Sequence, residues 1–415
     1  MTGFIEGDAG AVMDREVEGD GVVAPLVATL AGDAGAVGSI PWSPDGARVV
    51  TTCVIMCRGI AEVWDAATGA CAVTFTGHRG KICAVAWSPD GARVLTGSDD
   101  GTAKVWDSVT GACTATLRHG GGVTVVAWSP DGARVLTRST HGTAKVWNPA
   151  TGACSAVLEA PNGVAWSPDS ARVACTCGDS VDVWDLATRV CVATLVGPGG
   201  SACVVAWSPD GAQILTTFRE ARVGPDIVRT PPMVWNLATE TCAATLSGHD
   251  KLVNLAAWSP DGARILTGSE DKTAKVWDAA TGTCVATLAD RGRSIHEVAW
   301  SPRGARVMTR SRYGTAKVRD PTTGVCTDIL VGRVYRAAWS PDCTRLLTGS
   351  RRGTAQVHDG PAKVWDVSLH HQRVVARAIR VSQGRLHRAF LRGERDLPFL
   401  PPEMWRLLRT WCHHF

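Results

Sequence analysis

The chain has 415 residues, of which 45% are hydrophobic and 20% charged, and its formal net charge at pH 7 is +4. This composition is typical of a globular protein with a large core, and nothing in it suggests a membrane protein. The N-terminal stretch MTGFIEGDAGAVMDREVEGD is acidic and contains no apolar run. We therefore predict no signal peptide and an intracellular location, cytoplasmic or nuclear.

The charge is distributed unevenly along the chain. Residues 1–30 contain one arginine and six acidic residues, a balance of −5, whereas residues 367–415 contain nine arginines and three acidic residues, a balance of +6. We expect an acidic flexible arm over residues 1–24, a folded domain over 25–366 and a basic tail over 367–415.

Two short strings recur along the chain. The first, WSPDGAR or a close variant, occurs eight times at intervals of roughly 40 residues, which indicates an internal repeat. Its copies begin at Trp42, Trp87, Trp128, Trp166, Trp207, Trp258, Trp300 and Trp339. The second, AKVWD or a variant, follows each copy and contributes Trp64, Trp106, Trp147, Trp184, Trp235, Trp277 and Trp365, with Arg319 instead of Trp in the seventh copy.

Each period alternates short apolar runs with turns rich in proline, glycine and aspartate. The runs are too short for stable helices and favour four β-strands per period. A single four-stranded sheet cannot cover both of its faces, so neighbouring repeats must stack, and closing the stack into a ring removes its open ends. The sequence thus predicts an all-β fold, a closed β-propeller.

The repeats resemble those of the WD-repeat propellers of the G-beta type, over about residues 25 to 366. The resemblance rests on Gly77-His78, Gly248-His249, the SPDG turn and the strands that end in Trp-Asp. It implies a buried tetrad of His, Ser or Thr, Asp and Trp in each well-kept blade. Two blades match, with His78, Thr96, Asp100 and Trp106, and with His249, Thr267, Asp271 and Trp277. The other blades depart from the pattern. Asp33 stands at the His position of the first blade and His141 at the Asp position of the third. The Asp and Trp positions hold Tyr313 and Arg319 in the seventh blade and Arg352 and His358 in the eighth.

The count of repeats predicts eight four-stranded blades, with seven as the alternative because seven is commoner in the family. The repeats supply one fewer fourth strand than eight blades need. The N-terminal segment 25–32, PLVATLAG, resembles the fourth-strand segment CVATLVG at 191–197, so we expect it to complete the last blade and close the ring. The stretch 353–366 contains two candidates for the third strand of that blade.

The chain contains 15 cysteines, an odd number that fits a reducing compartment. Most occur once per period in the fourth strand, where we predict buried, small apolar side chains. They are Cys71, Cys113, Cys154, Cys191, Cys242, Cys284 and Cys326. No spacing matches a zinc site, and we expect neither a metal nor a cofactor.

Arginines gather in the loops of the last two repeats, which the resemblance places on the top face of the propeller. They are Arg291, Arg293, Arg310, Arg312, Arg333, Arg351 and Arg352. Together they would suit an acidic or phosphate-bearing partner; nucleic acid and phosphoinositides are less favoured. The alternatives are drift of the repeat toward arginine and neutralisation by the acidic arm. The arginines that follow the SPDG turns are predicted to be solvated turn charges of little energetic effect.

Two segments depart from the repeat. An insertion at 218–233 lengthens a loop of the fifth blade. It is either a binding loop or extra loop length that the fold tolerates. In the tail, an amphipathic helix is expected near 402–412, with Trp405, Leu408 and Trp411 on its apolar side. This helix would dock on the propeller or contact a partner, and LPPEMW resembles the start of an F-box.

No GxSxG elbow, HExxH pair or phosphate-binding glycine loop occurs in the sequence, and we predict no enzyme activity. The favoured function is a scaffold that binds partner proteins or peptides on the propeller face, as a monomeric propeller within a complex. The alternatives are a ubiquitin-ligase adaptor that uses the F-box-like segment, and a receptor for anionic ligands that uses the arginines.

Overall fold

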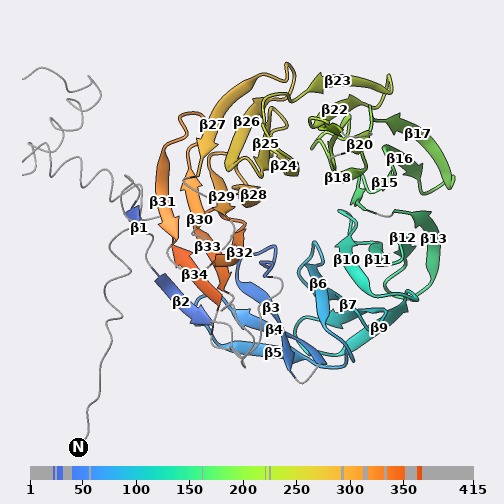
Figure 1. Ribbon diagram of the computed structural model, residues 1–415. Helices are drawn as coiled ribbons and strands as arrows, with labels where there is room; N and C mark the ends of the chain where they lie inside the picture. Colours follow the sequence, from blue (N-terminus) through green and yellow to red (C-terminus); the bar gives the residue numbers. More distant parts are fainter. Residues whose placement is uncertain are drawn as a thin grey trace, which may run out of the picture. The chain divides into compact units, whose positions relative to one another are not determined.

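The computed structural model describes residues 22–23, 26–30, 40–55, 58–160, 162–219, 221–223, 226–290, 294–311, 316–330, 334–350 and 362–366. The chain divides into two units, 1–368 and 369–415, and all described residues lie in the first. The predicted tail helix, with Trp405, Leu408 and Trp411, lies outside them. Every regular element in the described ranges is a β-strand, as Figure 1 shows, and none of these ranges contains a helix that could cross a membrane.

The strands form successive antiparallel sheets, which we number in chain order. The first is β3 (Arg48–Ile55), β4 (Arg58–Asp65) and β5 (Cys71–Phe75). The second is β6 (Ile82–Trp87), β7 (Arg93–Ser98), β8 (Thr102–Asp107) and β9 (Cys113–Arg118). The third is β10 (Val123–Trp128), β11 (Val135–Ser139), β12 (Thr143–Trp147) and β13 (Cys154–Glu159). The fourth is β14 (Val164–Trp166), β15 (Arg172–Cys177), β16 (Ser180–Asp185) and β17 (Val190–Val196).

The later sheets include two additions to the pattern. The fifth is β18 (Ala202–Trp207), β19 (Gln213–Phe218), β22 (Met233–Asn236) and β23 (Thr241–Thr245), with a separate hairpin of β20 (Ala221–Val223) and β21 (Asp226–Val228). The sixth is β24 (Val253–Trp258), β25 (Arg264–Ser269), β26 (Thr273–Asp278) and β27 (Cys284–Ala289). The seventh is β28 (Ile295–Trp300), β29 (Val307–Ser311), β30 (Ala316–Arg319) and β31 (Cys326–Leu330), extended by β1 (Val22–Val23). The eighth is β32 (Val334–Trp339), β33 (Arg345–Ser350), β34 (Ala362–Asp366) and β2 (Leu26–Leu30).

The repeated turn explains why each first strand ends where it does. In the second sheet the Ser88 hydroxyl donates to the Asp90 carboxylate and accepts the Arg93 amide, at 2.5 and 2.9 Å. Gly91 closes the turn with φ of 68°, in the left-handed region that glycine adopts without strain. The SPDG string is therefore a self-capped turn.

The core lies between consecutive sheets. Leu95 and Val105 of the second sheet pack with Val123 and Trp128 of the third in one buried cluster. Gly97 is part of this contact, since a Cβ there would lie 2.7 Å from Val123 and Val126. Each sheet thus buries one face against the next, as the repeat argument requires.

Three of the arginines after the SPDG turns, Arg48, Arg93 and Arg345, connect neighbouring sheets, which corrects their prediction as solvated charges. Arg48 of the first sheet donates to the Gly91 carbonyl of the second at 3.0 Å, and its guanidinium lies 5.0 Å from the Trp87 ring centre. Arg93 is placed in the same way over Trp128 of the third sheet, at 4.5 Å. A planar cation that stacks on an aromatic ring is more than a surface charge, because its stem and face also pack.

The same contact joins the last sheet to the first. Arg345 donates to the Gly46 carbonyl at 2.6 Å and lies 4.8 Å from the ring centre of Trp42. Trp42 in turn donates through Nε1 to the Ala338 carbonyl at 3.1 Å. The two ends of the sheet series are therefore in direct contact.

The N-terminal strand pairs where the sequence predicts. β2 runs antiparallel to β34, with Thr29 opposite Lys363. Trp365 lies opposite Leu346, which is the register of Trp106 opposite Val94, so the third strand of the eighth sheet is 362–366. This corrects the assignment of His358 to the tryptophan position. β1 belongs to the predicted flexible arm, but it pairs in parallel with β31.

The prediction that the periodic cysteines are buried is wrong for most of them. Five are exposed, namely Cys71, Cys113, Cys154, Cys242 and Cys284, and Cys191 and Cys326 are half-buried. The fourth strand is the outermost of each sheet, and in β9 only Leu117 is fully buried. Each cysteine is the first or second residue of this strand and lies at a bulge opposite the tryptophan position, as Cys113 does opposite Trp106.

This exposure predicts selective thiol labelling. With iodoacetamide at about pH 8, the five exposed cysteines should be alkylated in the folded protein, because access limits the reaction. Cys175 is fully buried, and burial raises the pKa of its thiol to about 12, so it should react only after unfolding. Peptide mass spectrometry measures both. Labelling of Cys175 at the rate of Cys113 in the folded protein would contradict the prediction.

Candidate functional site

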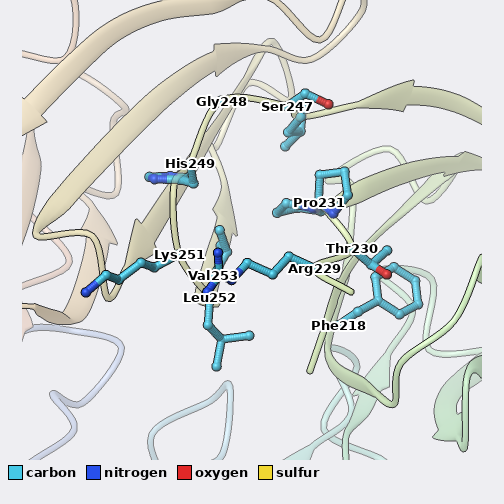
Figure 2. A pocket seen from close by; sticks show the side chains of 12 residues that line it. Phe218, Arg229, Thr230, Pro231, Ser247, Gly248, His249, Lys251, Leu252 and Val253 are labelled. Atoms are coloured by element: carbon cyan, nitrogen blue, oxygen red, sulfur yellow. The ribbon is translucent and has the colours of Figure 1, made fainter. Parts of the chain in front are cut away.

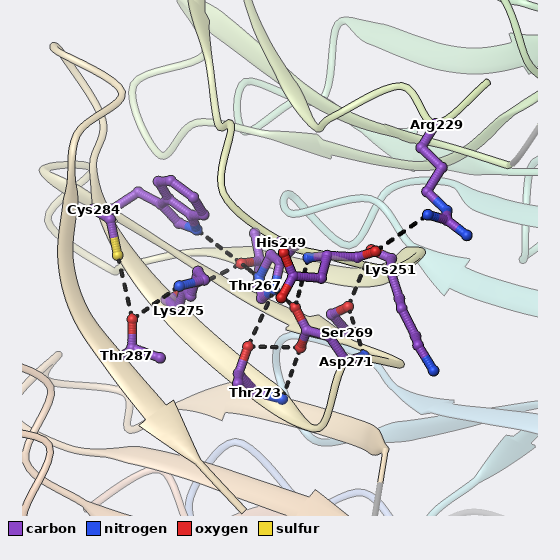
Figure 3. Close-up of polar contacts among 12 residues, drawn as sticks. Arg229, His249, Lys251, Thr267, Ser269, Asp271, Thr273, Lys275, Cys284 and Thr287 are labelled. Carbon is purple, nitrogen blue, oxygen red and sulfur yellow. Dashed lines mark hydrogen bonds and ion pairs between the residues drawn. The ribbon is translucent and has the colours of Figure 1, made fainter. Parts of the chain in front are cut away.

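The polar residues predicted for the sixth repeat meet in one network, drawn in Figure 3. His249 precedes β24, Thr267 lies in β25, Asp271 in the following turn and Trp277 in β26. His249 Nε2 is 2.8 Å from Thr267 Oγ1, and Nδ1 is 2.7 Å from Asp271 Oδ2. Trp277 Nε1 donates to Thr267 Oγ1 at 2.8 Å.

The network determines which ring nitrogen of His249 carries the proton. The carboxylate of Asp271 only accepts, so Nδ1 must carry the hydrogen and Nε2 must accept from the Thr267 hydroxyl. Burial lowers the pKa of His249 despite its Asp271 partner, which keeps the imidazole neutral. Every member then has its hydrogen bonds, and the ring, hydroxyl and carboxylate are held in place by each other.

The second repeat contains the same arrangement. His78 Nδ1 is 3.0 Å from Asp100, and Nε2 and Trp106 Nε1 both lie 2.8 Å from Thr96 Oγ1. Burial opposes ionisation of Asp100, but hydrogen bonds from Thr102, the Arg79 amide and His78 outweigh it and lower the pKa of Asp100 to about 2. Burial lowers the pKa of His78.

These pKa shifts predict that acid destabilises the fold in two stages. His78 and His249 titrate below the usual 6.5 in the folded state, so the unfolded chain binds their protons first, and stability should fall as pH drops below about 6.5. Asp100 adds a second loss as pH falls from 3.8 toward about 2. Thermal unfolding at a series of pH values measures both. Changing both histidines to Asn should reduce the first slope; the exposed His141→Gln is the control, and equal slopes in all proteins would refute the assignment.

The third repeat keeps part of the network and shows a residue that sequence analysis missed. Trp147 Nε1 donates to Thr137 Oγ1 at 2.8 Å. His119 stands at the histidine position, 6% exposed, and neither ring nitrogen has a partner in the described ranges. It was missed because Arg118 replaces the preceding glycine. His141, at the aspartate position, is exposed.

The seventh repeat replaces the tetrad with buried charges. Asp290 stands at the position of Gly248, one residue before the histidine position, and lies 2.5 Å from Lys317 Nζ and 4.0 Å from Arg319 Nη2. Arg319, at the tryptophan position, also donates to the Ala289 carbonyl at 2.9 Å. Asp328 lies on the adjacent strand and is 1% exposed. Asp290 and Lys317 have no counterpart in the family tetrad, so the resemblance gave no signal for them.

Of the arginine sector, the structure describes only Arg310. Its side chain is buried, and Nε donates to Glu297 Oε2 at 2.7 Å. Arg310 therefore is not part of an exposed patch, which corrects its prediction as a partner-binding residue. The other members, Arg291, Arg293, Arg312, Arg333, Arg351 and Arg352, lie outside the described residues.

A pocket of about 230 Å³ lies between the fifth and sixth sheets, shown in Figure 2. It is bounded by the end of the insertion in the fifth repeat and by the segment that contains His249. Its lining is Phe218, Arg229, Thr230, Pro231, Pro232, Leu246, Ser247, Gly248, His249, Lys251, Leu252 and Val253. The insertion predicted as a lengthened loop thus contains the hairpin β20–β21 and contributes one wall of a pocket.

A second pocket of about 310 Å³ lies on the outer flank, beside β13 and β16. It is lined by Cys154, Val157, Trp184 and Leu186 among others. Within the described ranges no group of three or more His, Cys, Asp or Glu residues could hold a metal ion.

The chain matches a family model described as "WD domain, G-beta repeat" over residues 69–107, 111–148, 240–278 and 324–366. Among solved structures it is similar to the C-terminal WD40 domain of Sif2, with a TM-score of 0.70 and 15% identity over 84% of this chain and 99% of that one. It is also similar to the computationally designed Ika8 protein, with a TM-score of 0.68 and 24% identity over 82% and 99% of the two chains.

Two curated relatives match a shorter segment. The B-type cell cycle switch protein ccs52B of Medicago truncatula is 27% identical over 119 residues, 28% of this chain and 23% of the relative. Protein FIZZY-RELATED 3 of Arabidopsis thaliana is 26% identical over 119 residues, with the same coverage of 28% and 23%. The matched segment thus spans less than a quarter of each relative.

Proposed function

We propose, from the premise that this chain is a WD40-repeat protein, that it is a non-catalytic intracellular scaffold whose propeller face binds partner proteins or peptides. The likeness to WD40 domains supports this proposal at the level of fold, and function must come from the residues on the loops. Each repeat sheet is then one blade of the propeller.

The proposal includes a closed propeller of eight blades. Its support is the series of eight repeat sheets in the described ranges and the contact of Arg345 with Gly46 and Trp42, which repeats the contact between earlier neighbours. β2 supplies the outer strand of the eighth blade from the N-terminal side of the chain, so both ends of the domain meet in one blade. A ring fixed in this way holds its loops in constant positions.

One observation carries the scaffold proposal. The side chains that resemble a catalytic group, His249, Thr267 and Asp271, are bonded to one another and to Trp277, and none is left to activate a nucleophile. The largest departure from the repeat is instead a surface insertion that forms a hairpin and one wall of a pocket. The repeat is altered most at the surface, where a partner would bind. The polar side chains of the tetrad, in contrast, are bonded to one another inside the blade.

Affinity capture with mass spectrometry tests the scaffold. The full chain should retain a reproducible set of partners, and changing Arg312, Arg351 and Arg352 to Glu should remove some of them if this sector contributes. Arg310 is left unchanged because it is buried and paired with Glu297. The outer-strand change Arg118→Glu serves as the charge control. Failure of the full chain to capture any partner would overturn the proposal, and a chain that ends at Asp366 shows whether the tail is needed.

A further inference from the structure

We propose that the outer flank of blades three and four binds an extended, uncharged segment of a partner protein. The segment pairs with β17 as an added strand and places one large apolar side chain in the pocket beside β13. We define the flank as β17 (Val190–Val196) together with this pocket. The inference goes beyond the proposed scaffold function, because it uses the rim of the propeller instead of its face.

The strand β17 is the outermost strand of its sheet and is unusually apolar, as can be followed in Figure 1. Its sequence, VCVATLV, contains no charged residue, and with seven residues it is the longest outer strand of the described sheets. Ala193 and Leu195 belong to the core cluster shared with the fifth blade. On the other side of the strand, Val190, Val192 and Val196 are 54, 43 and 61% exposed. An exposed apolar strand with a free edge is a template for another strand.

The seventh blade shows that an outer strand of this fold accepts a further strand. β1 pairs in parallel with β31, so that a short segment of chain adds a fifth strand to that sheet. Other outer strands end in a charge, as β9 does at Arg118 and β13 at Glu159. Charges on an edge strand oppose the addition of another strand. In the described ranges β17 has neither a charge nor a covering strand.

The pocket lies where the fourth blade departs from the repeat. In five blades the tryptophan of the third strand donates through Nε1 to a threonine of the second strand. In the fourth blade Cys175 stands at the threonine position, and Trp184 Nε1 has no hydrogen-bond partner in the described ranges. Trp184 is half-buried and lines the pocket. Leu186, also in the lining, stands where the second and sixth blades have the small residues Ser108 and Ala279.

The turn before β17 departs from the repeat as well. The amide of Arg189 donates to the Asp185 carbonyl, as the amide of Gly111 donates to Asp107 in the second blade. Arg189 has φ of 60°, in the left-handed region that favours glycine. At Gly111 a Cβ would lie 2.9 Å from Val73 of the preceding blade, so glycine allows the turn and the outer strand to approach closely. Arg189 cannot approach β13 in this way, and a pocket of about 310 Å³ lies between them.

The lining of this pocket is mostly apolar and carries no net charge. Val157, Trp184 and Leu186 provide large apolar side chains, and the unpaired indole of Trp184 provides one hydrogen-bond donor. Asp185 and Arg189 contribute one charge of each sign. A volume of about 310 Å³ accommodates one aromatic or large aliphatic side chain and is at the lower limit for a small-molecule site. The lining therefore favours an uncharged segment with one large apolar residue.

A slender segment fits this flank better than a second copy of the chain. A second copy would contact the flank mainly along one strand of seven residues. Stable protein interfaces bury about 1,200–2,000 Å² in total, which is more than one short strand offers. An added peptide strand, in contrast, gains affinity from backbone hydrogen bonds and specificity from a side-chain pocket.

Peptide binding to the full chain tests the flank. The first pool consists of fluorescein-labelled peptides in which a central Phe, Trp or Leu is flanked on both sides by random Val, Ile or Thr, with two terminal lysines for solubility. The second pool has alternate backbone amides N-methylated, and the third has aspartate as the central residue. In fluorescence polarisation the first pool should bind about tenfold more tightly than either of the others. The second lacks donors for strand pairing, and the third cannot fill an apolar pocket.

Lysine variants connect this binding to the flank. Val192→Lys in β17 and Val157→Lys in the pocket should each weaken binding of the first pool about tenfold. Val285→Lys is the matched control, because Val285 occupies the position of Val192 in the sixth blade and is 42% exposed. It should change binding less than about twofold. All three valines are exposed, so the melting temperatures should be unchanged.

The flank proposal is wrong if the first pool binds no more tightly than either of the others, or if Val192→Lys and Val285→Lys lose binding equally. Light scattering of the full chain detects another occupant. A dimer that Val192→Lys dissociates would mean that a second copy covers β17, which would also overturn the proposal. If partner capture persists in these cases, the flank proposal fails and the scaffold proposal stands. If the full chain captures no partner, the scaffold proposal fails, whereas the flank is judged by the pools alone.

Discussion

Asp271→Ala is expected to lower the free energy of unfolding by about 3 kcal/mol. The carboxylate accepts hydrogen bonds from His249 Nδ1, the Thr273 hydroxyl and the amide of Asp250. Its removal leaves these donors without a partner, and the His249 side chain is only 2% exposed, so water replaces the bond poorly. A buried donor left unsatisfied costs about 1–3 kcal/mol, and the tetrad couples several of them.

Urea unfolding measures this loss, and the exposed neighbour Glu270→Ala is the matched control. Glu270→Ala should change stability by less than about 0.5 kcal/mol. The corresponding change in the second blade, Asp100→Ala, should reproduce the effect because its contacts are the same. If Asp271→Ala and Asp100→Ala each lowered the free energy of unfolding by less than about 1 kcal/mol, water would be forming the hydrogen bonds that the carboxylate had accepted.

Strand positions could be predicted because the repeated turns define them chemically. Ser88, Asp90 and Gly91 satisfy their own polar groups locally, so the string itself specifies where β6 ends. The pairing of β2 with the last blade could be predicted for a similar reason, since 25–32 has the pattern of an outer strand. The tetrad geometry followed from the family resemblance.

Contacts between blades could not be predicted from the repeat. Whether Arg48 is solvated or stacked on Trp87 depends on the distance between neighbouring sheets. The sequence pattern within one repeat does not specify that distance. The exposure of Cys113 depends on which strand is outermost and which face it turns to solvent. The burial of Arg310 required Glu297, which lies on the adjacent strand at a position without a motif.

In the seventh blade several residues of the repeat are replaced together by charged side chains. Arg319 stands where the sixth blade has Trp277, and Asp290, at the position of Gly248, lies 4.0 Å from it, so charged side chains replace part of the neutral network. Together with Lys317 and Asp328, they make two cations and two carboxylates. Matched buried charges contribute little net stability, but an incomplete set is costly.

Asp290→Ala should therefore destabilise the protein by about 3–5 kcal/mol, more than any single surface change, because Lys317 loses the carboxylate at 2.5 Å and Arg319 the one at 4.0 Å. The informative comparison is the triple change Asp290→Gly, Arg319→Trp and Asp328→Ala, which introduces the residues of the sixth blade at these three positions. Thr309 Oγ1, buried and without a partner in the described ranges, would then accept from the new tryptophan. Lys317 can remain, since Lys275 is its counterpart in the sixth blade and donates to Thr287.

Urea unfolding of Asp290→Ala and of the triple variant distinguishes two explanations of the charges in this blade. If the charges function as a compensated set, Asp290→Ala loses several kcal/mol whereas the triple variant stays within about 1 kcal/mol of the original or exceeds it. If Asp290 is instead solvated in the folded protein, Asp290→Ala should be almost neutral. The Asp290 side chain is 4% exposed, which leaves little room for solvation, and so the large loss in the single variant is the expected result.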